Sequence, residues 1–280
     1  MEIFGKRPWI QAAIDKFTLE EAIPCAQMAV DCGVDWVEVG TPLIYGEGLE
    51  SIRELKKIAG DKASIMVDFK IRTNVYDIFL KAKEAGCDVA TISCAGGNDP
   101  AIIEGLRARQ DCGIKIIADL CGSELRIFPK RTEDLCGLGY AVILHYGDDQ
   151  WFYNYVREMA DGVRECKKVA GDVPIGCCCG YAPPGKGTGL DAYGNVIEAI
   201  KQGVDWVVVG GALTGDMIKT HTKDLDSFVS SFIAVENKNS LNRISQDILE
   251  KHLGFNNPRI VFLSSQYFIF VYYRKTICLL

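Results

Sequence analysis

The stretch GVDWVEVG at residues 33–40 returns almost unchanged as GVDWVVVG at residues 203–210, and the two copies differ only at Glu38 and Val208. Each copy reads as a short apolar strand that ends at a glycine. Looser copies are AGCDVATIS at 85–93 and LGYAVILHY at 138–146. A recurring strand unit predicts a repetitive sheet, and the carboxylate in one copy needs a separate explanation.

Four more strand candidates lie between these copies, so we predict eight strands. They are WIQAAID (9–15), ASIMVDFK (63–70), GIKIIADL (113–120) and VPIGCCCG (173–180). Most gaps hold an amphipathic helical stretch that closes on a glycine, such as GLESIRELKKIAG, NVYDIFLKAKEAG and VREMADGVRECKKVAG. Eight alternations within about 220 residues predict a parallel (β/α)8 barrel of the TIM type. An open doubly wound sheet is the alternative, but the first turn, DKFTLEE, lacks the glycine fingerprint of a dinucleotide fold.

The period stops near Phe232, so we assign residues 1–232 to the barrel and 233–280 to a C-terminal extension. The final stretch, IVFLSSQYFIFVYYRKTICLL, is aromatic-rich and β-prone. Three interpretations of the extension stay open. It packs on the barrel as an extra hairpin, pairs with a partner subunit, or is an aberrant end of the reading frame.

Composition excludes several classes of partner. The net charge is −6 and the pI about 5.2, so no global basic field attracts nucleic acid or an anionic membrane. The N-terminus lacks a secretory signal, and no apolar run reaches bilayer length. Most of the 12 cysteines lie in apolar segments, which is typical of buried thiols in a reducing compartment. We therefore predict a cytoplasmic protein.

Charged residues stand late in five of the predicted strands. They are Asp15, Glu38, Asp68 with Lys70, Asp119, and His145 followed by Asp148 and Asp149. A buried charge is unfavourable unless it is paired or binds a ligand, and chemistry in such barrels lies where the strands end. We therefore expect these side chains to converge on one rim. Glu38 would then face a ligand that Val208 does not need to touch.

The residue types at this rim indicate a specific chemistry. Asp68 and Lys70 are two apart, so the strand period places both on one face. A lysine among carboxylates stays protonated and could stabilise an enediolate oxygen, and two of the carboxylates suit Mg²⁺. His145 is placed to act as a general acid or a hydrogen-bond donor.

Strands seven and eight end in glycine instead, at Gly180 and at Gly210-Gly211. Glycine lets the backbone approach a ligand closely, and amides at a following helix N-terminus bind phosphate without a net positive charge. Barrels of this type frequently hold phosphate after strands seven and eight. We therefore predict phosphate binding at these glycines.

Five motifs in order, VDWVEVGTPLIYGEG, VDFK, IADLCG, LHYGDDQ and VVVGGALTG, resemble the orotidine 5′-monophosphate decarboxylase suprafamily over about residues 8–230. The nearest branches are 3-hexulose-6-phosphate synthase and 3-keto-L-gulonate-6-phosphate decarboxylase. The resemblance implies a homodimer with sites at the interface, a phosphorylated sugar as substrate, and Mg²⁺.

Carried over to matching positions, the resemblance implies a role for each rim residue. Glu38 and Asp68 would bind the metal, Lys70 would stabilise the enediolate, and His145 would assist proton transfer. Asp15 and Asp119 would hold substrate hydroxyls, while Gly180, Gly210 and Gly211 would bind phosphate.

The motifs HYGDDQ, ADLCG and GGALTG favour the synthase branch, an aldehyde-lyase that adds formaldehyde to ribulose 5-phosphate or reverses that step. A carboxy-lyase of the keto-gulonate or orotidine type is the alternative.

One position departs from the family pattern Asp-x-Lys-x-x-Asp. The chain reads DFKIRT, with Thr73 where the second aspartate stands in relatives. In the family that aspartate reaches the partner's site. A phosphosugar-binding barrel without catalysis is therefore a third hypothesis.

Overall fold

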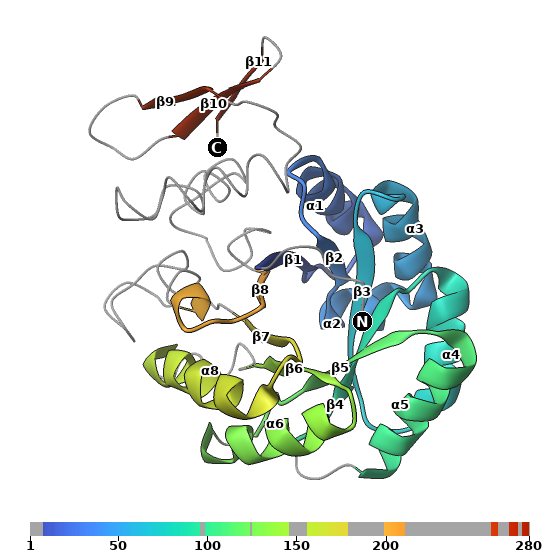
Figure 1. Cartoon of the computed structure of the whole chain (residues 1–280). Coiled ribbons are helices and arrows are strands. Elements are labelled where there is room, and N and C mark those ends of the chain that lie inside the picture. Colours follow the sequence, from blue (N-terminus) through green and yellow to red (C-terminus); the bar gives the residue numbers. More distant parts are fainter. Residues whose placement is uncertain are drawn as a thin grey trace.

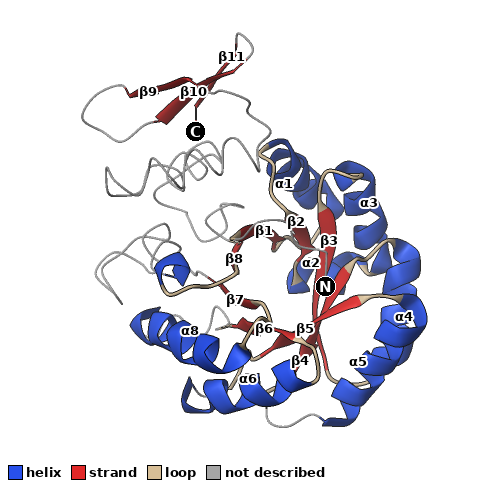
Figure 2. Cartoon of the chain, in the orientation of Figure 1, coloured by secondary structure: helices blue, strands red, loops and turns tan. Residues whose placement is uncertain are grey.

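The structure is a computed structural model that describes residues 8–95, 99–123, 125–145, 156–178, 199–210, and three strands near the C-terminus. Eight parallel strands close into a barrel in sequence order, and β8 pairs with β1. They are β1 (Trp9–Ile14), β2 (Trp36–Val39), β3 (Ser64–Ile71), β4 (Val89–Ser93), β5 (Lys115–Asp119), β6 (Ala141–Leu144), β7 (Ile175–Cys178) and β8 (Trp206–Val209). Helices surround them (Figures 1 and 2). The predicted (β/α)8 barrel is confirmed.

The described helices lie between successive strands. They are α1 (Leu19–Asp31), α2 (Thr41–Glu47), α3 (Leu49–Ala59), α4 (Val75–Ala85), α5 (Asp99–Cys112), α6 (Phe128–Gly137) and α8 (Val156–Ala170), with a 3-10 turn η1 (Leu125–Ile127). The glycines predicted to close α3, α4 and α8 have φ values of +53° at Gly60, +109° at Gly86 and +57° at Gly171. These are left-handed conformations that glycine adopts readily, so the helices end where the sequence predicts.

The C-terminal extension contains β9 (Arg259–Phe262), β10 (Ile269–Tyr273) and β11 (Thr276–Leu279). They form a separate antiparallel sheet with β10 in the middle. The β-prone character of this segment is thus confirmed for these residues. The boundary at residue 232 lies outside the described residues and stays a prediction.

The aspartate of the repeated GVDW unit has a structural role. Asp35 Oδ2 accepts a hydrogen bond from the Ile10 amide at 2.8 Å, and Asp205 Oδ2 accepts one from the Ile175 amide at 2.7 Å. Asp88, in the looser copy, bonds the amide of the preceding strand in the same way. Each aspartate therefore joins the start of its strand to the neighbouring strand, which explains why the unit recurs.

The tryptophan of the same unit fills the barrel interior where the strands begin. Ring centroids of Trp9 and Trp36 lie 6.0 Å apart, and those of Trp36 and Trp206 lie 5.6 Å apart. Gly176 makes room for this packing, because a Cβ there would lie 2.0 Å from Trp206 Cε2. Large apolar side chains thus close one end of the barrel, which leaves the other end for polar groups.

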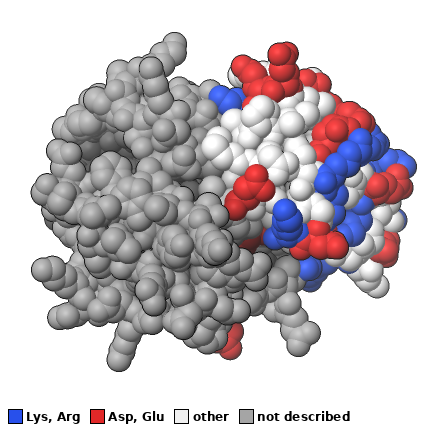
Figure 3. Space-filling model, turned by 90° about the horizontal axis from the view of Figure 1, so that it is seen from above, with Lys and Arg blue, Asp and Glu red and all other residues white. Residues whose placement is uncertain are grey.

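The described surface carries both signs of charge in alternation, as the coloured part of Figure 3 shows. The described helices carry ion pairs between residues three apart, such as Lys81 with Glu84 and Lys130 with Glu133. Among the residues whose placement is given, no helix combines the length and apolarity that crossing a membrane requires.

Candidate active site

The predicted rim residues gather at the mouth where the strands end. Asp15 follows β1, Glu38 lies in β2, Asp68 and Lys70 in β3, Asp119 ends β5, and His145 follows β6. Three of the carboxylates are almost fully buried, with exposures of 4% for Glu38, 5% for Asp68 and 1% for Asp119. Buried carboxylates cannot be explained by packing alone, because burial disfavours their charged form. The predicted convergence is therefore found for these residues.

Asp68 is held by side chains from two strands, β3 and β4, and from helix α2. Its Oδ1 accepts a hydrogen bond from Thr91 Oγ1 at 2.9 Å, and its Oδ2 forms an ion pair with Lys70. Thr41 Oγ1 lies 2.9 Å from the same Oδ2 and from Lys70 Nζ. Burial alone raises the pKa of Asp68, but Lys70 and His145 outweigh it, so this pKa lies below its usual value. Asp68 is thus ionised and oriented.

Lys70 reaches the mouth by an irregular backbone, not by regular strand alternation. Its φ is +46°, and the β3–β4 register shifts between Val67 and Ile71. The Lys70 amide donates to Thr91 Oγ1 at 3.1 Å, which supports this uncommon conformation. Burial lowers the pKa of Lys70, but the carboxylates of Asp68 and Asp119 more than reverse this and raise it. The lysine therefore stays cationic.

Glu38 lies beside a polar residue that sequence reasoning missed. Gln11, in β1 and 1% exposed, donates from Nε2 to Glu38 Oε2 at 2.6 Å. The buried Gln11 Oε1 has no hydrogen-bond partner among the described residues. Burial, and then the charges of Asp68 and Asp15, raise the pKa of Glu38 well above its usual value. A positive charge bound nearby would stabilise the ionised form of this carboxylate.

Asp119 and His145 form a hydrogen-bonded pair. Asp119 Oδ2 lies 2.9 Å from His145 Nδ1, and Asp119 Oδ1 accepts from the Cys121 amide at 2.7 Å. Burial lowers the pKa of His145, but the adjacent Asp119 carboxylate more than offsets this and raises it above the usual value. The pair thus orients the imidazole and favours its protonated form.

Asp15 lies between the glycines that end the two copies of the repeat. A Cβ at Gly40 would lie 2.1 Å from Asp15 Oδ1, and one at Gly210 would lie 3.0 Å from Asp15 Oδ2. The structure therefore gives Gly210 a packing reason that does not involve phosphate, whose binding there stays a prediction. Gly180, Gly211 and residues 146–149 lie outside the described residues, and so do their predicted contacts.

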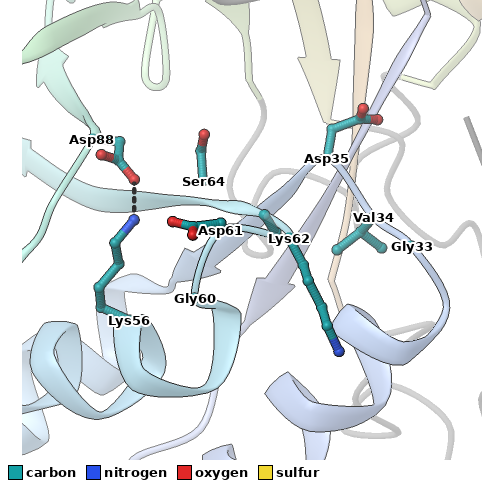
Figure 4. A pocket seen from close by; sticks show the side chains of 10 residues that line it. Gly33, Val34, Asp35, Lys56, Gly60, Asp61, Lys62, Ser64 and Asp88 are labelled. Atoms are coloured by element: carbon teal, nitrogen blue, oxygen red, sulfur yellow. Dashed lines mark hydrogen bonds and ion pairs between the residues drawn. The ribbon is translucent and has the colours of Figure 1, made fainter.

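A polar hollow of about 390 Å³ lies at the opposite end of the barrel, where strands β2 to β4 begin. Its lining includes Gly33, Asp35, Lys62 and Ser64, together with the pair Lys56 Nζ and Asp88 Oδ2 at 3.0 Å (Figure 4). The hollow is lined by three aspartates and two lysines, so charged groups of both signs face it. Because chemistry in such barrels lies at the other end, we do not place the active site here.

Comparison with known proteins agrees with the barrel fold. Residues 8–128 match the model of the orotidine 5′-phosphate decarboxylase / HUMPS family. The chain is 29% identical over 216 residues to the 3-hexulose-6-phosphate synthase of Bacillus subtilis, covering 76% of this chain and 94% of that relative.

Two solved structures share the fold. The 3-hexulose-6-phosphate synthase from Salmonella typhimurium has a TM-score of 0.65 at 24% identity, covering 80% of this chain and 96% of that one. The 3-keto-L-gulonate-6-phosphate decarboxylase from Vibrio cholerae has a TM-score of 0.64 at 18% identity, covering 85% and 99%.

The resemblance to the orotidine 5′-monophosphate decarboxylase suprafamily that was inferred from the motifs is therefore confirmed by the family-model match and by the similarity to these proteins. The relatives of this chain are named as enzymes, both synthases and decarboxylases. At these identities the structural likeness establishes the fold alone.

Proposed function

We propose that this protein is a Mg²⁺-dependent aldehyde-lyase that acts on a ketose phosphate through an enediolate, in the manner of 3-hexulose-6-phosphate synthase. The observation that carries the proposal is the cationic Lys70, held by Asp68 at a mouth that also contains the buried Glu38 and Asp119. A fixed positive charge in a buried site stabilises an oxyanion that forms during reaction. The similarity to the Bacillus synthase supports this branch.

The residues fit a magnesium ion. Glu38 and Asp68 offer only oxygen donors, which Mg²⁺ prefers, and their mutual repulsion contributes to the raised pKa of Glu38. The buried Gln11 Oε1 is a further acceptor without a donor in the described structure. Bound there, Mg²⁺ would supply positive charge for the enediolate oxygens.

Each protein group then has a defined task. Neutral His145 takes the C1 proton of ribulose 5-phosphate at Nε2, which leaves an enediolate, and C1 of the enediolate attacks the carbon of formaldehyde to form the new carbon–carbon bond. Lys70 holds negative charge on the enediolate, and Asp15 and Asp119 accept hydrogen bonds from substrate hydroxyls. His145, with Nδ1 held by Asp119, uses Nε2 to supply the proton that the new alkoxide needs.

A substitution at Lys70 tests this assignment. Purified protein given ribulose 5-phosphate, formaldehyde and Mg²⁺ should consume formaldehyde, and Lys70→Ala should stop consumption. Lys115→Ala, a change at the start of β5, is the matched control and should leave the rate unchanged. Consumption that survives Lys70→Ala would contradict the proposed site.

Two alternative functions for this fold are a carboxy-lyase and a phosphosugar-binding barrel without catalysis. Thr73 is the observation that favours the non-catalytic barrel. Thr73 is exposed, just beyond β3, at the position where relatives of this pattern carry aspartate. A panel of sugar phosphates, with a keto-gulonate phosphate included, separates the hypotheses. Release of bicarbonate selects the decarboxylase, whereas binding without turnover, relieved by Thr73→Asp, selects the non-catalytic barrel.

The proposal includes a cytoplasmic homodimer with its sites at the interface. Two large exposed side chains beside the mouth support the dimer, Phe17 at 67% and Tyr45 at 77% exposure. They are neighbours, because the Phe17 carbonyl packs where a Cβ on Gly46 would lie. The free thiols of the described cysteines support the reducing compartment. Analytical sedimentation of Tyr45→Ser and of the natural protein tests the dimer, and the variant should dissociate at a higher protein concentration than the natural protein.

A further inference from the structure

A second set of metal-binding atoms lies beside the proposed magnesium ligands. Ligand atoms of Asp119, Cys121 and His145 all lie within 4.8 Å of one another. Within the described part of the chain, this is the group of three His, Cys, Asp or Glu residues whose ligand atoms lie close enough together to hold one metal ion. Asp119 is buried, and the other two are half-buried. Cys121 has no role in the proposed reaction.

The backbone holds these three residues in place. β5 and β6 pair in register at Asp119 and Ile143, and the Leu120 amide donates to the Ile143 carbonyl at 3.1 Å. The Cys121 amide donates to Asp119 Oδ1, which turns the chain so that the thiol returns toward the carboxylate. The group therefore comes from a regular part of the sheet and a short turn.

The donor set differs in chemical character from Glu38 and Asp68. Thiolate, imidazole and carboxylate are the ligands of Zn²⁺ and related transition metals, whereas Mg²⁺ takes oxygen. Three protein ligands leave a fourth tetrahedral position for water or another ligand. The electrostatic setting favours a cation, because the buried carboxylates at the mouth outnumber Lys70.

We propose that Asp119, Cys121 and His145 form a binding site for a thiophilic transition-metal cation of the Zn²⁺ class. Binding uses the neutral imidazole and releases the Cys121 thiol proton to solvent. The proposed function assigns Asp119 and His145 to substrate, so the cation and the substrate compete for these groups. Metal of this class would then inhibit the proposed reaction; this inhibition rests on the proposed function, whereas the binding site itself does not.

Cobalt substitution tests the site without substrate. Co²⁺ is added to the full-length protein in excess Mg²⁺, and absorption is recorded. We expect one equivalent to bind with a thiolate-to-cobalt charge-transfer band and tetrahedral d–d bands, both removed by one equivalent of Zn²⁺. The bands should be lost in Cys121→Ser and in His145→Ala. They should persist in Cys136→Ser, a change of a half-buried cysteine on α6.

Two results would overturn the proposal. One is the absence of a thiolate band from the natural protein, and the other is a band that persists in Cys121→Ser while circular dichroism shows a folded barrel. Because the measurement uses no sugar phosphate, a failed lyase assay leaves it intact. Formaldehyde turnover without cobalt binding would refute the site and keep the proposed function.

Discussion

Adding one methyl group at Gly40 tests how the mouth is assembled. The φ of Gly40 is −65°, so alanine meets no backbone strain and any effect comes from packing. The new Cβ would lie 2.1 Å from Asp15 Oδ1 and 2.8 Å from the Ile14 carbonyl oxygen. The Asp15 side chain can rotate away, but the Ile14 carbonyl belongs to β1 and can move only with the strand.

The two contacts determine how much unfolding free energy we expect Gly40→Ala to cost. Overpacking of a well-packed site costs about 1–3 kcal/mol, and the backbone contact places Gly40→Ala toward the upper value. At Gly210 the added Cβ would lie 3.0 Å from Asp15 Oδ2 and 3.5 Å from Ala13 Cβ, so a small shift of one side chain suffices. We expect Gly210→Ala to cost about 1 kcal/mol or less.

Urea unfolding, followed by the fluorescence of the buried tryptophans, measures these differences. In an Asp15→Ala background the cost of Gly40→Ala should fall by about 1 kcal/mol, because the nearer of the two contacts is gone. If Gly40→Ala unfolds at the same urea concentration as the natural protein, or if its cost is unchanged without Asp15, the packing described for the mouth is wrong.

Three further outcomes follow from the hydrogen bonds and charges. Because the pKa of Glu38 is raised, its contribution to folding is present below the usual value of 4.5 and lost as pH rises through the folded pKa. Without divalent metal, the unfolding free energy of Glu38→Gln should therefore exceed that of the natural protein by a margin that grows as the pH rises above the usual value of 4.5. Thr91→Val removes a donor to the charged Asp68 and should cost about 1.5–3 kcal/mol, against about 1 for Thr132→Val, whose hydroxyl contacts a thiol. Asp205→Ala removes the acceptor of a backbone amide at 2.7 Å and of a lysine at 2.9 Å, and should cost about 3 kcal/mol in the same assay.

Most of the barrel could be predicted because its strands and helices are local and repetitive. Apolar strand runs, amphipathic helices and closing glycines each depend on neighbouring residues, and eight repetitions leave few alternative topologies. The convergence of Asp15, Glu38 and Asp119 could be predicted for the same reason, since parallel strands end at one rim. The helix α2 was not predicted, because TPLIYGE lacks a clear amphipathic pattern.

The parts that could not be predicted depend on contacts between distant residues. The expected reason for Lys70 facing the mouth was regular alternation, whereas a left-handed residue and a Thr91 side chain position it. One feature of the sequence could have identified Gln11 as a site residue, because it is a polar residue in the middle of an apolar strand. Cys121 became a metal-ligand candidate only once the fold placed it beside His145, which follows a different strand.

The repeated octapeptide supplies an internal control for the role of Glu38. In register, Glu38 lies beside Ala13 and Met66 in the barrel interior, and Val208 lies beside Gln11 and Cys178, with exposures of 4% and 7%. Since valine packs well in one copy, the fold does not need a carboxylate in the other. Its burial, next to further carboxylates, destabilises the folded chain without a cation. A group that weakens the fold and that packing does not require is best explained by a ligand at the mouth.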